Sequence, residues 1–158
     1  MASLFSSFGG TPAASGVWTG TGFDYNNSTG SFTTVSTLTI SRVATYAMPI
    51  LIQLDWGSSA SSNRSQVSMG GTGTSVRCEL NLVSSSTGNL GSHIFGQSVG
   101  VSGLRNLYLE PAGFKWIDPT PANGGNTTYT LTARILVTGA GGTVSMYRCR
   151  LIAYEWGG

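Results

Sequence analysis

Charged residues are scarce in this chain of 158 residues. Only 9% of them are Asp, Glu, Lys or Arg, whereas an average globular domain contains about 25%. The formal net charge is +2, and residues 1–22 contain no Lys or Arg. Proteins that bind nucleic acid carry a basic patch or a basic arm. The charge pattern therefore predicts no nucleic-acid partner.

Long apolar runs are also absent. No segment approaches the roughly 18 consecutive apolar residues of a membrane-spanning helix, and an N-terminus without positive charge does not fit a secretory signal. We therefore expect that the chain does not insert into a membrane. We also expect that it is synthesised in a reducing cytoplasm. Cys78 and Cys149, the only cysteines, lie within alternating strand patterns. This favours two buried thiols, although the sequence leaves a disulfide between them open.

Residues that support catalysis or metal binding are equally few. His93 is the only histidine, and no cysteine, histidine or aspartate spacing matches a metal site. Cys78 and His93 could form a nucleophile and base pair, but the position of Cys78 inside a strand pattern favours burial. Two of the six carboxylates could meet across a sugar, as in a glycosidase. We nevertheless predict no catalytic residue, no metal and no cofactor.

Glycine is abundant, with 23 residues, and 40% of the chain is hydrophobic. The low charge together with this hydrophobic content argues against disorder, which combines low hydrophobicity with high net charge. Apolar and polar residues alternate in short runs from Ser31 onward, which predicts half-buried strands separated by Gly-rich turns. The runs lie at residues 37–41, 50–56, 76–82, 94–101, 104–110, 114–117, 129–137 and 143–155. We predict an all-β fold, an antiparallel β-sandwich of the jelly-roll type with about eight strands; an immunoglobulin-like sandwich is the alternative.

The last two runs carry two further predictions. The Gly-rich turn at residues 139–142 predicts that they form a hairpin. The final run is apolar in both alternating sets, which indicates that both of its faces are covered. One cover is the second sheet and the other a neighbouring subunit. The predicted interface residues are Tyr147, Cys149, Leu151 and Ala153.

The N-terminal residues lack a sustained period and predict an extended arm at residues 1–30, followed by the jelly-roll domain at residues 31–158. Apolar side chains in a segment too rich in Gly to fold alone are typical anchors for a partner. We expect them to dock on a different protein or a neighbouring subunit; the alternative is that they pack on their own sandwich. The anchor residues are Leu4, Phe5, Phe8, Val17 and Trp18.

The C-terminal half carries a recurrent set of motifs: Asp118-Pro119, Gly124-Gly125, the run TTYTL from Thr127, the Gly-rich turn, and the run LIAYE from Leu151. Together they resemble the jelly-roll modules of bacteriophage tail fibres, head fibres and capsid decoration proteins. More distantly, they resemble the trimeric fold of complement C1q and tumour necrosis factor. The resemblance covers residues 31–156. It implies a homotrimer that packs around a threefold axis through apolar strand faces.

The resemblance also implies a place and a role. It predicts a non-enzymatic virion protein, made in the host cytoplasm and bound to other virion proteins such as the major capsid protein or a tail or fibre component. Because only a short segment precedes the first predicted strand, we expect a capsid decoration or cement protein, or a short head fibre, anchored by its arm. The alternative is a tail-fibre tip that binds a host receptor or a cell-surface glycan.

Overall fold

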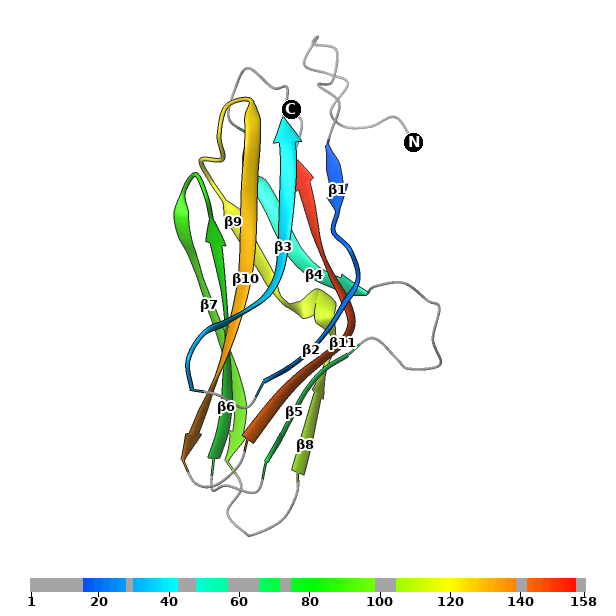
Figure 1. Cartoon of the computed structure of the whole chain (residues 1–158), viewed down its shortest axis with the longest axis vertical. Helices are drawn as coiled ribbons and strands as arrows, with labels where there is room; N and C mark the ends of the chain where they lie inside the picture. The colour runs from blue at the N-terminus through cyan, green and yellow to red at the C-terminus, as the bar shows by residue number, and fades with distance from the viewer. Residues whose placement is uncertain are drawn as a thin grey trace, which may run out of the picture.

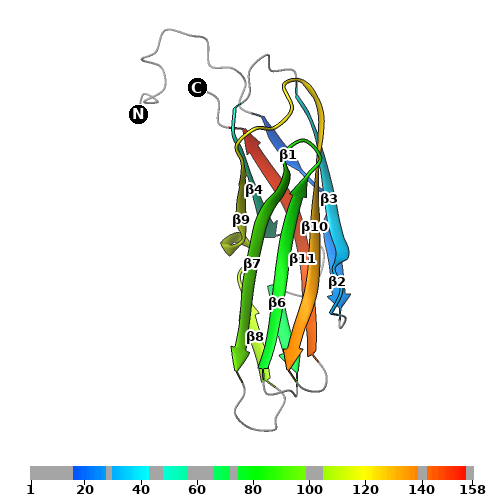
Figure 2. The same ribbon diagram turned by 90° about the vertical axis from the view of Figure 1, so that its left-hand side faces the viewer.

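The computed structural model describes residues 16–27, 30–42, 48–56, 66–71, 75–98, 105–138 and 142–155. Within these ranges the chain forms eleven strands and one short 3-10 helix, η2 (Pro111–Gly113). The strands make two antiparallel sheets that pack face to face along the length of the molecule (Figures 1 and 2). Among the described residues, no helix is long and apolar enough to span a membrane. The predicted all-β sandwich is therefore confirmed.

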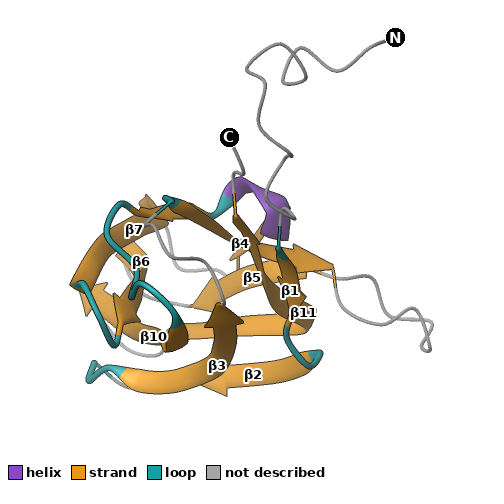
Figure 3. Cartoon of the chain, turned by 90° about the horizontal axis from the view of Figure 1, so that it is seen from above, coloured by secondary structure: helices purple, strands orange, loops and turns teal. Residues whose placement is uncertain are grey.

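The larger sheet contains β11, the longest of its strands, with shorter strands on both sides. Its members are β1 (Val17–Thr19), β2 (Phe23–Asn27), β4 (Ile50–Trp56), β5 (Gln66–Gly71), β8 (Arg105–Leu109), β9 (Lys115–Asp118) and β11 (Gly142–Glu155). The smaller sheet has the order β3 (Thr33–Arg42), β10 (Gly125–Thr138), β6 (Ser75–Ser84) and β7 (Gly88–Ser98). Seen along the long axis in Figure 3, β6, β7 and β10 lie across from β4, β5 and β11.

Three of the four strand positions of the larger sheet are each occupied by two shorter strands in place of one continuous strand. Along one edge of β11, β4 pairs with residues 149–155 and β5 with residues 142–147. Along its other edge, β1 and β2 pair with residues 152–154 and 144–149. The third position is shared by β8, which pairs with β5, and β9, which pairs with β4. The eleven described strands therefore occupy eight strand positions, four in each sheet, which is the predicted number. The predicted runs account for seven of these positions, because residues 104–110 and 114–117 share one, and the position of β1 and β2 lies within the predicted arm.

The pairing of these positions identifies the jelly roll. In chain order, the first position (β1 and β2) pairs with the last, β11, and the second, β3, pairs with the seventh, β10. The third (β4 and β5) pairs with the sixth (β8 and β9), and the fourth, β6, with the fifth, β7. A chain folded as one long hairpin and wrapped around a core gives this order. In an immunoglobulin sandwich the first two strands are neighbours, so the alternative is excluded.

The predicted hairpin of the last two strands is wrong. β10 lies in the smaller sheet between β3 and β6, whereas β11 lies in the larger sheet. The chain crosses from one sheet to the other between them. Both strands have an apolar face that must be buried, and crossing places these two faces on opposite sides of one core. A Gly-rich turn allows either connection, so the turn alone did not determine the pairing.

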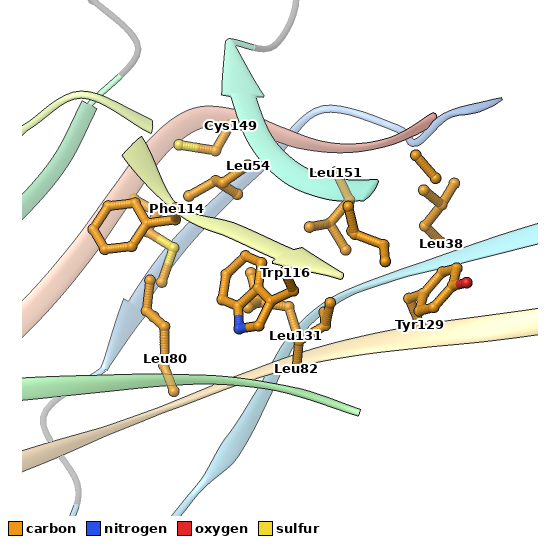
Figure 4. Close-up of a cluster of buried hydrophobic side chains, with 14 of the residues drawn as sticks. Leu38, Leu54, Leu80, Leu82, Phe114, Trp116, Tyr129, Leu131, Cys149 and Leu151 are labelled. Atoms are coloured by element: carbon orange, nitrogen blue, oxygen red, sulfur yellow. The ribbon is translucent and has the colours of Figure 1, made fainter. Parts of the chain in front are cut away.

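The core is formed by the inward residues of both sheets (Figure 4). Leu54 and Leu151 come from the larger sheet, and Leu80, Leu82 and Leu131 from the smaller one; all five are fully buried. Strict alternation with period two places these side chains on one face of each strand. Replacing a buried Leu by Ala in such a core costs about 2–5 kcal/mol. This packing holds the outer faces of the two sheets in fixed positions.

A β-bulge interrupts the alternation of β11. Tyr147 pairs with Gln66 and Cys149 with Trp56, so the register passes over Arg148, whose φ is 51°. The backbone N–H of Arg148 donates to Asp24 Oδ1 at 2.7 Å. Because the bulge adds one residue, Met146 and Cys149 both face the core and are fully buried. Regular alternation would have placed these two side chains on opposite faces.

Candidate interaction surface

An apolar row crosses the outer face of the larger sheet near one end. The residues are in register across four strands: Val17 of β1 pairs with Tyr154 of β11, Tyr154 with Leu51 of β4, and Leu51 with Ile117 of β9. We call these four residues the outer row. Val17 and Ile117 at its two ends are 60% and 61% exposed, and Leu51 and Tyr154 between them are half-buried. Their strand neighbours Trp18, Ile52, Ala153 and Trp116 face the core.

The next row along the same face is mixed. It consists of Thr19, Ile152, Gln53 and Lys115. Ile152 is only 4% exposed, whereas Thr19 and Lys115 are exposed. One step further, Arg150 pairs with Asp55 at 3.4 Å. Among the side chains described on this face, the apolar ones at this end are therefore the outer row and Ile152 beside it.

A buried carboxylate fixes the β9 end of the outer row. Asp118 follows Ile117, is fully buried, and points between the sheets. Its Oδ2 accepts hydrogen bonds from Ser84 Oγ of β6 at 2.8 Å and from Tyr129 OH of β10 at 3.1 Å. The hydroxyl of Thr87 also donates to Asp118. The larger sheet is thus pinned to the smaller one directly beneath Ile117.

An arginine fixes the β11 part of the outer row in the same way. Arg42 of β3 is 3% exposed and forms an ion pair with Glu155, the residue after Tyr154. Its Nη1 also donates to the carbonyl of Ala122 at 2.9 Å. The backbone N–H of Glu155 donates to the carbonyl of Gly16 at 2.9 Å, next to Val17. Glu155 therefore links β11 to the smaller sheet through its side chain and to the residue before β1 through its backbone.

Three of the four predicted interface residues are not on the surface. Cys149, Leu151 and Ala153 are fully buried in the chain's own core, and only Tyr147 is partly exposed. A fully buried side chain cannot contact a neighbouring subunit without opening the sandwich. Their assignment as interface residues is therefore corrected: this set of β11 faces the smaller sheet, and the set that contains Ile152 and Tyr154 faces outward.

The predicted arm is described only from residue 16. Leu4, Phe5 and Phe8 lie outside the described residues. Trp18 packs partly buried against the core, whereas Val17 points outward. Residues 17–27, expected within the extended arm, form β1 and β2 and pair with β11 of the same chain. Trp18 thus contacts the chain's own sandwich, which is the alternative predicted for the anchor residues.

The single histidine closes one side of the sandwich. His93 Nε2 lies 2.8 Å from the carbonyl oxygen of Lys115, and the ring packs edge-on against Trp116 with centroids 4.8 Å apart. Trp116 Nε1 donates to the carbonyl of Gly91 at 3.0 Å, so β7 and β9 are joined across the gap between the sheets. Cys78 is fully buried, and burial raises its pKa to about 12. A thiol in that state is a poor nucleophile.

The outer face of the smaller sheet differs from that of the larger one. Arg134 pairs with Glu79 and stacks over the ring of Phe32, with its guanidinium carbon 4.4 Å from the ring centroid. Burial acts to raise the pKa of Glu79, but hydrogen bonds from Ser92 and Arg134 and the charge of Arg134 lower it below its usual value. Ile94 is 61% exposed on this face. In the part of the chain that is described, no three His, Cys, Asp or Glu residues are grouped as metal ligands.

No protein-family model matches the sequence, and no curated protein matches it. Among solved structures, the fold is similar to a structure of the Gx strain of infectious bursal disease virus, with 11% identity and a TM-score of 0.41. It is also similar to the VP2 subviral particle of that virus, with 12% identity and a TM-score of 0.40. Both alignments cover 92% of this chain and 38% of the other. With TM-scores below 0.5, these likenesses carry no argument about function.

Sequence reasoning missed the outer row as a unit. Alternation assigns Leu51 and Ile117 to the outer face of their strands, where polar residues are expected. The sequence therefore shows that each of these two positions is unusually apolar. Their alignment with Val17 and Tyr154 is not visible, because it depends on pairing between segments far apart in the chain. The signal was four scattered apolar residues, and the structure brings them into one row.

Proposed function

We propose that this chain is a non-enzymatic structural protein of a virus particle. In this proposal it forms a homotrimeric capsid decoration or cement protein, or a short head fibre, and residues 1–15 anchor it to another virion protein. The resemblance of the C-terminal half to phage jelly-roll modules suggests the particle. The outer row is the observation that carries an assembly role, because exposed apolar residues gathered on one face mark protein contacts.

The hydrogen bonding of the side chains also supports a structural role. Three of the carboxylates are held by arginines, in the pairs Arg42–Glu155, Arg134–Glu79 and Arg150–Asp55. The carboxylate of Asp118 is used to pin the two sheets. These groups stabilise one arrangement of the sandwich, and a rigid sandwich suits a protein that presents a fixed surface to its neighbours.

Deleting residues 2–15 tests the anchoring role. Gly16 is kept because its carbonyl accepts the hydrogen bond from Glu155. The truncated chain should fold and keep the wild-type oligomeric state, but it should no longer incorporate into particles. Particle binding is measured by co-sedimentation with particles that lack this protein. Wild-type occupancy by the truncated chain would show that the attachment surface lies on the sandwich and that the arm is not the anchor.

A tail-fibre tip that binds a host glycan is the second candidate. The observation that favours it is the outer face of the smaller sheet, where Thr37, Thr39 and Thr128 form a hydroxyl-rich area. Phe32, just before β3, is 42% exposed, so part of its ring remains available for sugar stacking although Arg134 stacks over it. A fibre tip should compete with particles for adsorption to host cells, and Phe32→Ala should weaken that competition. No competition by the wild-type protein would reject this candidate.

A further inference from the structure

We propose that the outer row is the contact between copies of this chain, so that a second copy covers the outer face of the larger sheet. This inference rests on the proposed homotrimer and adds to it the surface that forms it. The contact residues are Val17, Leu51, Ile117 and Tyr154. They replace the buried residues of β11, which cannot reach another subunit.

The first argument is the difference between the two outer faces. On the smaller sheet, the two exposed large apolar residues, Ile94 and Phe32, are separated by the ion pair of Glu79 and Arg134, and β3 exposes Thr37 and Thr39. On the larger sheet, every strand position at the level of the outer row carries an apolar or aromatic side chain. An antiparallel sheet that faces water on one side normally alternates apolar and polar residues. A continuous apolar row at the end of that face therefore indicates a covering partner.

The second argument concerns which partner fits. The same face carries opposite charges toward its opposite edges: Lys115 is exposed on β9, and Asp24 is exposed on β2. Arg150 and Asp55 between them are already paired with each other. When the outer faces of two copies lie against each other with β9 of one over β1 and β2 of the other, Lys115 of one copy lies on the Asp24 side of its neighbour. A second copy is therefore a partner of complementary charge.

The third argument is that the backbone beneath the outer row is already rigid in the single chain. Ile117 precedes Asp118, and Tyr154 precedes Glu155, so two of the four residues adjoin groups that are fixed to the smaller sheet. Association orders little more of the chain when the contacting backbone is already rigid. A contact that repeats from one copy to the next around a ring forms a closed oligomer without leaving an open surface.

Two substitutions of equally exposed isoleucines test the inference. Ile117→Asp places a charge in the outer row, and Ile94→Asp places the same charge on the outer face of the smaller sheet; both isoleucines are 61% exposed. The full chain is analysed by sedimentation and light scattering over a range of concentrations. We expect wild-type and Ile94→Asp at three times the chain mass of 16.4 kDa, and Ile117→Asp at one chain mass. Burying the new charge should weaken association by about 30-fold or more per contact.

The outcomes separate the two proposals. A trimeric Ile117→Asp would overturn the assignment of the surface and leave the homotrimer standing. A monomeric wild-type protein would reject the homotrimer and this inference together. Loss of the trimer in both variants would also contradict the inference, since the effect would not be specific to the outer row. If circular dichroism shows that Ile117→Asp is unfolded, Val17→Asp at the other end of the row replaces it. The oligomeric mass of that variant is then judged in the same way.

Discussion

At the level of single residues, the Asp118 carboxylate is the clearest stabilising group outside the apolar core. It is fully buried and accepts hydrogen bonds from Ser84 and Tyr129 of the smaller sheet. Tyr129→Phe removes one hydrogen bond to a charged group and should cost about 1.5–3 kcal/mol. Asp118→Ala removes the acceptor of the Ser84, Thr87 and Tyr129 hydroxyls and should cost more than Tyr129→Phe, since each buried donor left unsatisfied costs about 1–3 kcal/mol. Urea unfolding measures both values; Thr37→Ala, an exposed change on β3, should stay within about 0.5 kcal/mol.

Cys78 predicts how stability depends on pH. Burial, with a smaller contribution from the charge of Glu79, raises its pKa from 9.0 to about 12. Below about pH 9 both the folded and the unfolded chain keep the proton, so there is no effect. Between about pH 9 and 12 the unfolded chain releases it and the folded chain does not. Stability should then fall with rising pH by up to about 1.4 kcal/mol per pH unit.

Cys78→Ala is the control for that pH dependence. Its free energy of unfolding at pH 8 is lower because a buried sulfur is lost, but its decline between pH 9 and 10.5 should be shallower than in the wild type. Tyr129, whose pKa is also raised by burial and by Asp118, adds a decline in the same direction that both proteins share. Equal slopes in the two proteins would contradict the assignment to Cys78.

At the level of elements, β1 has two faces with different roles. Trp18 packs partly buried against the core, whereas Val17 is exposed in the outer row. Gly16 leaves room for the Trp18 ring, since a Cβ at this position would lie 2.1 Å from a ring carbon of Trp18. Trp18→Ala should therefore lower the stability of the folded chain by about 1.5–3 kcal/mol. Chemical denaturation of a variant that is already monomeric, such as Ile117→Asp, measures this value without a subunit contribution.

Val17→Ser is the matched change on the other face of β1. In the same monomeric background it should alter stability by less than about 0.5 kcal/mol, because the side chain is exposed there. In the otherwise wild-type chain it should weaken association. Should Trp18→Ala leave the monomer unaffected, the ring would belong to a contact with a partner, as the sequence first suggested.

At the level of the whole molecule, association and folding are linked. A protein whose folded form binds other copies gains stability as its concentration rises, since binding removes folded monomer from the unfolding equilibrium. The thermal midpoint of the wild-type chain should therefore rise with protein concentration, and that of Ile117→Asp should be constant. Differential scanning calorimetry over a hundredfold concentration range measures both. A constant midpoint in the wild-type chain, together with a monomeric mass, would count against any stable oligomer.

The sequence by itself determined the fold class and the orientation of many side chains. Alternation in residues 76–82 and 129–137 predicts that Leu80, Leu82, Tyr129 and Leu131 face inward, and all four are fully buried. Strand side chains alternate for a local geometric reason, so this information is contained in short segments.

Only the tertiary structure decided which strands are neighbours, and the corrections arise from this. A Gly-rich turn is compatible with a hairpin or with a crossing between sheets, and the burial of two apolar faces determined the crossing of β10 to β11. The bulge at Arg148 is paired against a break between β4 and β5, so its effect on Met146 could not be read from β11 alone. The outer row depends on register across four strands that are distant in sequence. Cross-strand register is a property of the assembled sheet, and that is why this surface emerges only when the chain is folded.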